Sequence, residues 1–203
     1  MSVLRPTYTT IDGVVYLTRE EWIMPRGGYS REDGPAYRQW SVVNGQLILT
    51  HESWYLNGLR HRVDEPAYRE WRVVDGQTFL VCEGWYLNCQ SHRIDGPGFR
   101  RWLVVDGERV LTHEAWYLNG QRHRIDGSAW RQWVVAVRRV ALYREEWHLK
   151  GTKIHPRILR QPVRAIERWW QYQQARRQQA IEASLWDSGM TVFPGFMGLL
   201  REY

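Results

Sequence analysis

Residues 54–76 read WYLNGLRHRVDEPAYREWRVVDG, and close copies of this text recur through most of the chain. Tryptophans mark each copy at two positions, and both series have a spacing of 31 residues: Trp54, Trp85, Trp116 and Trp147, and Trp40, Trp71, Trp102 and Trp133. Trp22 continues the first series backwards with one inserted residue. Self-similarity at such a period is typical of a tandem structural repeat. We therefore predict a repeat domain over residues 11–156, preceded by a lead-in at residues 1–10.

Each copy contains the signals of short antiparallel strands. Dipeptides that favour hairpin turns recur, because both of their residues tolerate positive φ: Asn44-Gly45, Asp75-Gly76, Asp106-Gly107, Asn57-Gly58 and Asn119-Gly120. Beside the first of these turns, Arg38, Trp40 and Val42 alternate with other residues, as in a strand with two distinct faces. The sequence predicts a mainly β fold, an elongated antiparallel repeat meander that grows by one unit every 31 residues.

Charged residues hold fixed positions beside the tryptophans. A glutamate lies two residues before each tryptophan of the first series: Glu52, Glu83, Glu114 and Glu145. An arginine lies two residues before each tryptophan of the second series: Arg38, Arg69, Arg100 and Arg131. We predict that Arg pairs with Glu, and Trp with Trp, across neighbouring strands, each pair contributing about 0.2–1 kcal/mol. The alternative is that the arginines and tryptophans form a ligand groove.

Histidines and cysteines raise the question of chemistry. Three histidines are each followed three residues later by an aspartate: His61, His92 and His123, with Asp64, Asp95 and Asp126. Equivalent residues of neighbouring copies lie about 10 Å apart because two strands separate them, whereas zinc ligands lie about 2.0–2.3 Å from the metal. We therefore predict no metal site and no cofactor, with the aspartates setting a turn and the histidines packing at its edge. Cys82 and Cys89 have no neighbouring base in the sequence and do not indicate a nucleophile.

The text from the first tryptophan through His-Arg-x-Asp to Pro-Ala resembles the MORN repeat. The resemblance covers about 145 of the 203 residues and is most specific over residues 54–67, 85–98 and 116–129. It departs from the family in its longer period and in Arg62, Arg93 and Arg124, which stand where a glycine normally follows the histidine. The resemblance implies hairpins that stack into a single sheet, and scaffolding, dimerisation or lipid contact rather than catalysis. Variants with this text look most like proteins of large DNA viruses and phages.

The repeat stops after residue 156. Residues 157–186 are rich in Ala, Gln, Arg and Glu, which predicts a basic amphipathic helix. Its basic stripe consists of Arg157, Arg160, Arg164 and Arg168. Predicted partner-binding residues lie on this helix and on an apolar docking tail over residues 187–203: Trp169, Trp170, Val192, Phe193, Phe196, Met197, Leu199 and Leu200. The helix either covers one end of the sheet or docks onto a partner.

Composition narrows the class of protein. The chain has 13 Trp and 11 Tyr, residues that suit half-buried surfaces and interfaces. Its net charge of +6 comes mostly from basic residues that are interleaved with acidic ones. Because the sequence has no long apolar run and no secretory signal, we expect an intracellular protein or one inside a virus particle, and not a secreted one.

The sequence predicts a non-catalytic structural scaffold, a minor capsid-associated component of a large virus particle that docks onto other protein subunits through its C-terminal helix and tail. One alternative is a peripheral protein that binds anionic lipid, and a second is a non-specific nucleic-acid binder. The sequence contains no phosphate-binding glycine loop, paired acid and base, or metal-ligand cluster, so we do not expect an enzyme. Assembly as a homo-oligomer remains open.

Overall fold

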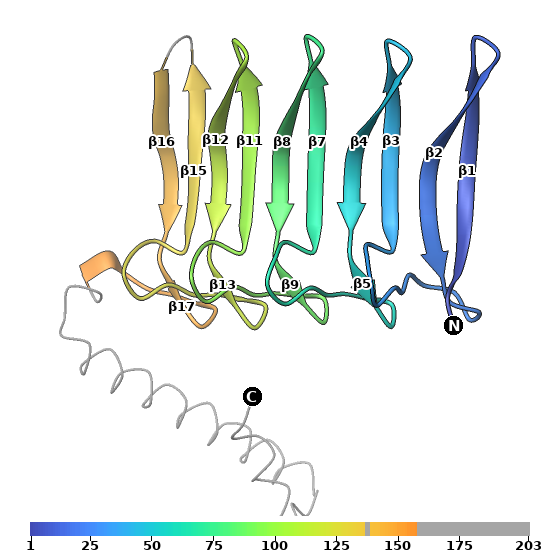
Figure 1. Ribbon diagram of the computed structural model, residues 1–203. Coiled ribbons are helices and arrows are strands. Elements are labelled where there is room, and N and C mark those ends of the chain that lie inside the picture. Colours follow the sequence, from blue (N-terminus) through green and yellow to red (C-terminus); the bar gives the residue numbers. More distant parts are fainter. Residues whose placement is uncertain (137–138, 158–203) are drawn as a thin grey trace, which may run out of the picture. The chain divides into compact units, whose positions relative to one another are not determined.

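The computed structural model describes residues 1–136 and 139–157. This part of the chain is mainly β, with hairpins side by side in one antiparallel sheet (Figure 1). Ten long strands follow one another across that sheet in chain order: β1 (Val3–Ile11), β2 (Val14–Ile23), β3 (Tyr37–Val43), β4 (Gln46–Ser53), β7 (Tyr68–Val74), β8 (Gln77–Gly84), β11 (Phe99–Val105), β12 (Glu108–Ala115), β15 (Trp130–Ala136) and β16 (Arg139–Glu146). The prediction of a mainly β fold built from antiparallel hairpins is confirmed.

Four short hairpins lie between and after the long ones. They consist of β5 (Tyr55–Leu56) with β6 (Leu59–Arg60), β9 (Tyr86–Leu87) with β10 (Gln90–Ser91), β13 (Tyr117–Leu118) with β14 (Gln121–Arg122), and β17 (His148–Leu149) with β18 (Thr152–Lys153). One long and one short hairpin make one copy of the repeat. The first compact unit of the chain, which holds all of these strands, covers Met1–Pro156.

Both kinds of hairpin close through two residues with positive φ. In the long hairpin β3–β4 the turn residues are Asn44 (φ 50°) and Gly45 (φ 75°), and in the short hairpin β5–β6 they are Asn57 (φ 51°) and Gly58 (φ 81°). The turns predicted at the other Asn-Gly and Asp-Gly dipeptides have the same conformation. These values are those of type I′ turns, whose twist matches that of the flanking strands.

The N-terminal residues differ from the prediction of a lead-in. Val3–Ile11 forms β1, which pairs with β2 over its whole length, so the first long hairpin begins at residue 3. The repeat pattern does not extend into β1, because this strand lacks the Arg-x-Trp text of the later copies. A strand needs only an extended, β-branched segment and the turn at Asp12-Gly13 to pair.

Every long hairpin contains a β-bulge at the same place. In β3–β4, Gln39 lies opposite His51 and Trp40 opposite Leu49, so Thr50 is an extra residue. The extra residues of the other long hairpins are Thr18, Val81, Thr112 and Tyr143. The Thr50 hydroxyl donates a hydrogen bond to the carbonyl oxygen of Gln39 at 3.1 Å. Because a bulge bends its strand and increases the local twist, all five hairpins bend at one level.

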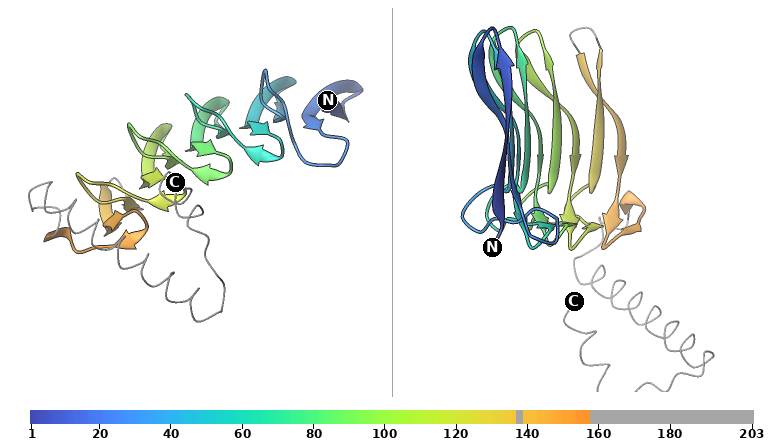
Figure 2. Two further views of the ribbon diagram at one scale, coloured as in Figure 1. Left: turned by 90° about the horizontal axis from the view of Figure 1, so that it is seen from below. Right: turned by 90° about the vertical axis from the view of Figure 1, so that its right-hand side faces the viewer.

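Neighbouring long hairpins are joined only on one side of this bulge. Strands β3 and β4 pair at seven positions, but β4 and β7 pair only where Ser53, Glu52 and His51 lie opposite Tyr68, Arg69 and Glu70. Beyond the bulge each hairpin continues as its own two-stranded ribbon. Figure 2 shows that the long hairpins form a single layer that twists along the row.

The short hairpins form a second line of contacts between copies. The Arg62 amide donates to the Tyr86 carbonyl at 3.0 Å, and the Cys89 amide donates to the Arg60 carbonyl at 2.8 Å. Bonds of this kind also join the other neighbouring copies. Close packing accompanies them, because Ala67 is fully buried where its carbonyl accepts the amide of Trp54. The core therefore lies at the end of the sheet where the copies meet.

Candidate interaction surface

The recurring tryptophans lie on one face of the sheet. Arg38 and Trp40 of β3 point to the same side because side chains alternate along a strand. The register places Arg38 opposite Glu52, and Nε1 of Trp54 donates to Oε1 of Glu52 at 3.3 Å, so both tryptophan series share that side. All members are partly exposed. We call this side the tryptophan face, defined by Trp40, Trp54, Trp71, Trp85, Trp102, Trp116, Trp133 and Trp147.

An alternating row of charges crosses the tryptophan face. The register places these residues side by side on neighbouring strands, in the order Glu20, Arg38, Glu52, Arg69, Glu83, Arg100, Glu114, Arg131 and Glu145. We call this row the charge ladder. The predicted Arg–Glu pairing across neighbouring strands is confirmed.

The closest contacts of the ladder hold separate hairpins together. Nη1 of Arg69 lies 3.4 Å from Glu52, and the equivalent Arg100–Glu83 and Arg131–Glu114 distances are 3.3 and 3.1 Å. Each of these pairs bridges the end of one hairpin and the start of the next. Within the hairpin β3–β4, by contrast, Arg38 lies 4.0 Å from Glu52. The ladder therefore strengthens the junctions between copies.

The predicted pairing of Trp with Trp is wrong. In the register Trp40 lies opposite Leu49, and Trp71, Trp102 and Trp133 lie opposite the equivalent leucines of their own hairpins. The bulge causes this difference, because its extra residue shifts the second strand by one position. The result is a band of alternating Trp and Leu side chains above the charge ladder.

Each tryptophan of the first series except Trp147 lies under an arginine eight residues later. The guanidinium carbon is 3.9 Å from the ring centroid for Arg62 over Trp54, 4.0 Å for Arg93 over Trp85, and 3.8 Å for Arg124 over Trp116. Arg31 lies over Trp22 at 4.6 Å. Cation–π contacts of this kind contribute about 0.5–2 kcal/mol, depending on exposure.

Aspartates hold Arg93 and Arg124 in place, whereas Arg62 pairs with Glu65 at 2.6 Å. Oδ1 of Asp95 accepts a hydrogen bond from Nε of Arg93 at 2.8 Å, and Asp126 does the same for Arg124 at 2.6 Å. These hydrogen bonds lower the pKa of both aspartates. A Cβ at Gly96 would lie 3.1 Å from the Arg93 guanidinium, although the preceding copy has Glu65 at this position. The predicted role of the aspartates as turn-setting residues therefore missed their main contact.

The recurring histidines bind the next copy rather than their own turn. Nδ1 of His61 accepts a hydrogen bond from the Asn88 amide at 3.3 Å, and Nδ1 of His123 accepts one from the Lys150 amide at 3.0 Å. Asn88 and Lys150 are the first turn residues of the following short hairpins. Burial and the charge of Lys150 lower the pKa of His123. Each histidine thus caps a neighbouring turn instead of packing at the edge of its own.

The opposite face carries an aromatic cluster under the short hairpins. The guanidinium of Arg60 lies 4.9 Å from the ring centroid of Tyr68 and 5.0 Å from that of Tyr86. Burial and a hydrogen bond to Glu21 raise the pKa of Tyr29, in the same cluster, to about 12. Burial raises the pKa of the Cys82 thiol to about 11, so this thiol is protonated at neutral pH.

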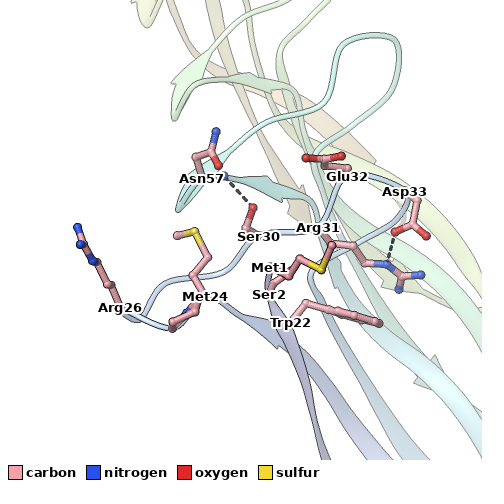
Figure 3. A pocket seen from close by; sticks show the side chains of 11 residues that line it. Met1, Ser2, Trp22, Met24, Arg26, Ser30, Arg31, Glu32, Asp33 and Asn57 are labelled. Carbon is pink, nitrogen blue, oxygen red and sulfur yellow. Dashed lines mark hydrogen bonds and ion pairs between the residues drawn. The ribbon is translucent and has the colours of Figure 1, made fainter.

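A pocket of about 860 Å³ opens at the first copy (Figure 3). Trp22 and Arg31 line one side of it, and Met24 and Arg26 line the loop across the opening. A groove of about 370 Å³ lies between two neighbouring copies, where residues 63–64 of one copy approach Trp85 of the next. Equivalent residues line the two hollows, with Trp22 and Arg31 in the first pocket at the positions of Trp85 and Arg93 in the groove.

One carboxylate in the last copy is surrounded by cations. Glu146 is 8% exposed and receives Arg122 at 2.7 Å, Arg144 at 2.7 Å and Lys153 at 3.2 Å. His148 Nε2 lies 3.3 Å from it. Burial alone would raise the pKa of Glu146, but the hydrogen bonds from Lys153, His148 and Arg144 outweigh it and lower the pKa to about 2. We call these four basic residues with Glu146 the Glu146 cluster.

Sequence reasoning missed three of these features. The Arg–Trp stacks had a signal in the constant offset of eight residues, and the bulge had one in the threonines Thr18, Thr50 and Thr112. The Glu146 cluster had a different signal, since Arg144, Glu146 and His148 depart from the text of the three middle copies.

Most of the residues predicted on the C-terminal helix and tail lie outside the described part of the chain. Arg157 is exposed and is the last described residue. The remaining members of the predicted basic stripe and of the partner-binding set lie outside the described residues: Arg160, Arg164, Arg168, Trp169, Trp170, Val192, Phe193, Phe196, Met197, Leu199 and Leu200.

The described residues contain no group of three or more His, Cys, Asp or Glu side chains placed to hold a metal ion. A search of the same residues finds no helix that is long and apolar enough to span a membrane. Comparisons with protein-family models, with curated proteins and with solved structures give no match to this chain.

Proposed function

We propose that this chain is a non-catalytic scaffold whose tryptophan face binds another protein subunit. The observation that carries the proposal is the placement of eight partly exposed tryptophans on one side of a single-layer sheet. Tryptophan is enriched in protein interfaces, where its large ring contributes apolar area and its N–H can form a hydrogen bond. Tryptophan and arginine are also the residues that contribute most to binding energy at protein interfaces.

The tryptophan face offers its side chains in fixed positions. Arg62, Arg93 and Arg124 each cover one face of a tryptophan ring, and these arginines are only 18–20% exposed. The charge ladder fixes a second set of long side chains. Because these side chains are ordered before binding, this chain loses less side-chain entropy when a partner binds.

The charge of the same face favours a protein over lipid or nucleic acid. The ladder alternates Arg with Glu, so its charges balance along the row. Binding to anionic lipid or to nucleic acid depends on a net excess of Lys and Arg. The MORN-like text supports a scaffold as well, because arrays of that family act in assembly rather than in catalysis. A location in a virus particle stays a prediction.

The proposal is tested by substitutions on opposite faces of the same strands. Trp71→Ser with Trp102→Ser removes two side chains of the tryptophan face, and the matched control changes the next residue of each strand, Arg72→Ser with Leu103→Ser. Tagged proteins are expressed in the organism that encodes the chain, cross-linked, purified and identified by mass spectrometry. Circular dichroism and thermal unfolding verify that both variants fold.

We expect wild type and control to recover the same partner in stoichiometric amount, with cross-links on the tryptophan face, and the tryptophan variant to lose it. Recovery that is equal for both variants would contradict the proposal. Binding to anionic vesicles or to single-stranded DNA that disappears only in the tryptophan variant would also contradict it, and would assign the face to that ligand.

A further inference from the structure

We propose that the Glu146 cluster is a binding site for a phosphate group. The site consists of Arg122, Arg144 and Lys153 arranged around the Glu146 carboxylate, beside the ring of Trp130. The proposal concerns the last copy and the face opposite the tryptophan face, so it does not depend on the proposed protein interface.

The charge of the cluster is the first argument. Three cationic side chains lie within 3.2 Å of one carboxylate, so 3 − 1 leaves a net charge of +2 when His148 is not counted. The Glu146 carboxylate needs only one cation to form an ion pair. The additional cations repel one another unless a second anion binds between them. A phosphate group carries nearly two negative charges at neutral pH and balances this excess.

The unused donors are the second argument. Both oxygens of Glu146 already accept hydrogen bonds: Oε1 from Arg144 and Lys153, and Oε2 from Arg122. Each arginine uses one nitrogen in these bonds, and within the described residues its other guanidinium nitrogens make no hydrogen bond. Arg144 and Lys153 are 59% and 64% exposed, so these donors face solvent. Two guanidinium groups and an ammonium match the several acceptor oxygens of a phosphate.

The position of the guanidinium groups is the third argument. The guanidinium carbons of Arg122 and Arg144 lie 5.4 and 5.5 Å from the centroid of the Trp130 ring. This contact and the shared carboxylate hold both arginines on one side of the sheet. The arginines and the lysine would contact the ligand, and Glu146 competes with it for their positive charges.

The repeat itself supplies the fourth argument. Four residues of the cluster differ from those at equivalent positions of the three middle copies, whereas the first copy already carries Arg19 and Glu21 at the positions of Arg144 and Glu146. Glu146 replaces Ser53, Gly84 and Ala115; Arg144 replaces His51, Cys82 and His113; His148 replaces Tyr55, Tyr86 and Tyr117; and Lys153 replaces Arg60, Ser91 and Arg122. A terminal copy is expected to differ in its outer surface, but here separate changes converge on one group of contacts.

The earlier copies also provide the variants for a test. Arg144→His with Lys153→Ser restores residues that equivalent positions of folded copies carry, and Glu146→Ala restores Ala115. Arg72→Gln is the control, since Arg72 is an exposed arginine on the same face of a middle copy. Binding of inorganic phosphate to the full chain is measured by calorimetry and thermal unfolding at about pH 8, where the new histidine is neutral, with sodium chloride keeping the ionic strength constant.

We expect saturable phosphate binding by wild type and Arg72→Gln, and affinity at least about tenfold weaker in Arg144→His with Lys153→Ser, because two charge-assisted donors are lost. Glu146→Ala should bind phosphate more tightly, since a competing negative charge is removed. A purely structural cluster predicts the opposite pattern, with lower melting temperatures and no change in phosphate binding. The proposal would be overturned if phosphate changed the melting temperature of wild type no more than chloride does. It would also be overturned if phosphate bound equally to all variants.

The source of the phosphate is assigned by a second arm. Phosphatidylcholine vesicles with and without phosphatidic acid are sedimented with wild type and with Arg144→His, Lys153→Ser. Co-sedimentation that requires both phosphatidic acid and the two cations assigns the site to a lipid headgroup. Calorimetric binding of free phosphate without co-sedimentation assigns it to a soluble phosphate group.

Discussion

At the scale of single residues, the turns contain the clearest strain. Asn88 and Cys89 form the turn of the short hairpin β9–β10, with φ of 49° and 64°. Equivalent turns have glycine at the second position, which adopts this conformation without a steric penalty. Cys89 has a Cβ and is exposed, so it gains little packing in return.

Replacing Cys89 with glycine should therefore stabilise the protein. We expect Cys89→Gly to raise the free energy of unfolding by about 1 kcal/mol, since the left-handed conformation costs a residue with a Cβ about 1–2 kcal/mol. Urea denaturation measures the change. Cys89→Ala is the control, because it removes the sulfur that accepts the Arg60 amide but keeps the Cβ. An equal gain in both variants would assign the effect to the thiol instead.

A histidine contact should make the protein sensitive to mild acid. Burial and the charge of Lys150 lower the pKa of His123 in the folded protein. Between this lowered pKa and the ordinary histidine pKa of about 6.5, the unfolded chain therefore binds more protons than the folded one. Stability should be complete above about pH 6.5 and fall as the pH decreases. We expect the loss in melting temperature from about pH 7.5 to about pH 5.5 to be smaller in His123→Gln.

The carboxylates do not confuse that measurement. The pKa values of Asp95, Asp126 and Glu146 are lowered, so the stability they contribute is lost only below about pH 4.5. An acid response of His123→Gln equal to that of wild type would show that His123 does not control it.

At the scale of the elements, the bulge links a threonine to the bend of three of the five long hairpins. The buried Thr112 hydroxyl donates to the Arg101 carbonyl at 3.1 Å, and Val81 fills the same position one copy earlier. We expect Thr112→Val to lower the free energy of unfolding by about 1 kcal/mol. Thr112→Ser, which keeps the hydroxyl, should restore much of it. A loss in Thr112→Ser as large as that in Thr112→Val would show that the methyl group matters more than the bond.

The charge ladder gives a second prediction at this scale. Glu83 is 8% exposed and lies between Arg69 and Arg100, with Nη1 of Arg100 at 3.3 Å. Glu83→Gln removes the carboxylate that the Arg100 guanidinium contacts, so we expect a loss of about 1–3 kcal/mol in denaturant unfolding. Glu145→Gln, at the exposed end of the ladder, should cost less than about 0.5 kcal/mol. Equal losses would mean that position in the ladder has no influence.

The sequence predicted the elements better than their contacts. Asn-Gly and Asp-Gly dipeptides determine local backbone conformation, so the turns could be read directly, and Arg38 and Glu52 were correctly paired because their offsets are constant. The opposite residue of Trp40 could not be found from alternation alone, since the bulge at Thr50 changes the register. The partner of His61 lies 27 residues away in the next copy, and such contacts depend on how copies stack.

At the scale of the whole molecule, the described repeats form a row in which each copy contacts its neighbours. The junctions consist of three paired strand positions, one Arg–Glu contact of the ladder and two backbone bonds between short hairpins. In such an array, stability is approximately a sum of terms for the copies and for their interfaces. The tryptophan face should therefore lengthen or shorten by whole copies without a change in its pattern.

Two deletions that differ by one residue test this central claim directly. Removing residues 72–102 joins Trp71 to Leu103 and takes out one copy in register. Removing residues 72–101 leaves one extra residue in the strand, which turns the side chains beyond it to the other face. Thermal and denaturant unfolding, followed by circular dichroism, should show one cooperative transition for the 31-residue deletion, at reduced stability, and a much weaker or absent transition for the 30-residue deletion. Equal behaviour of the two proteins, or loss of folding in the first, would contradict the account.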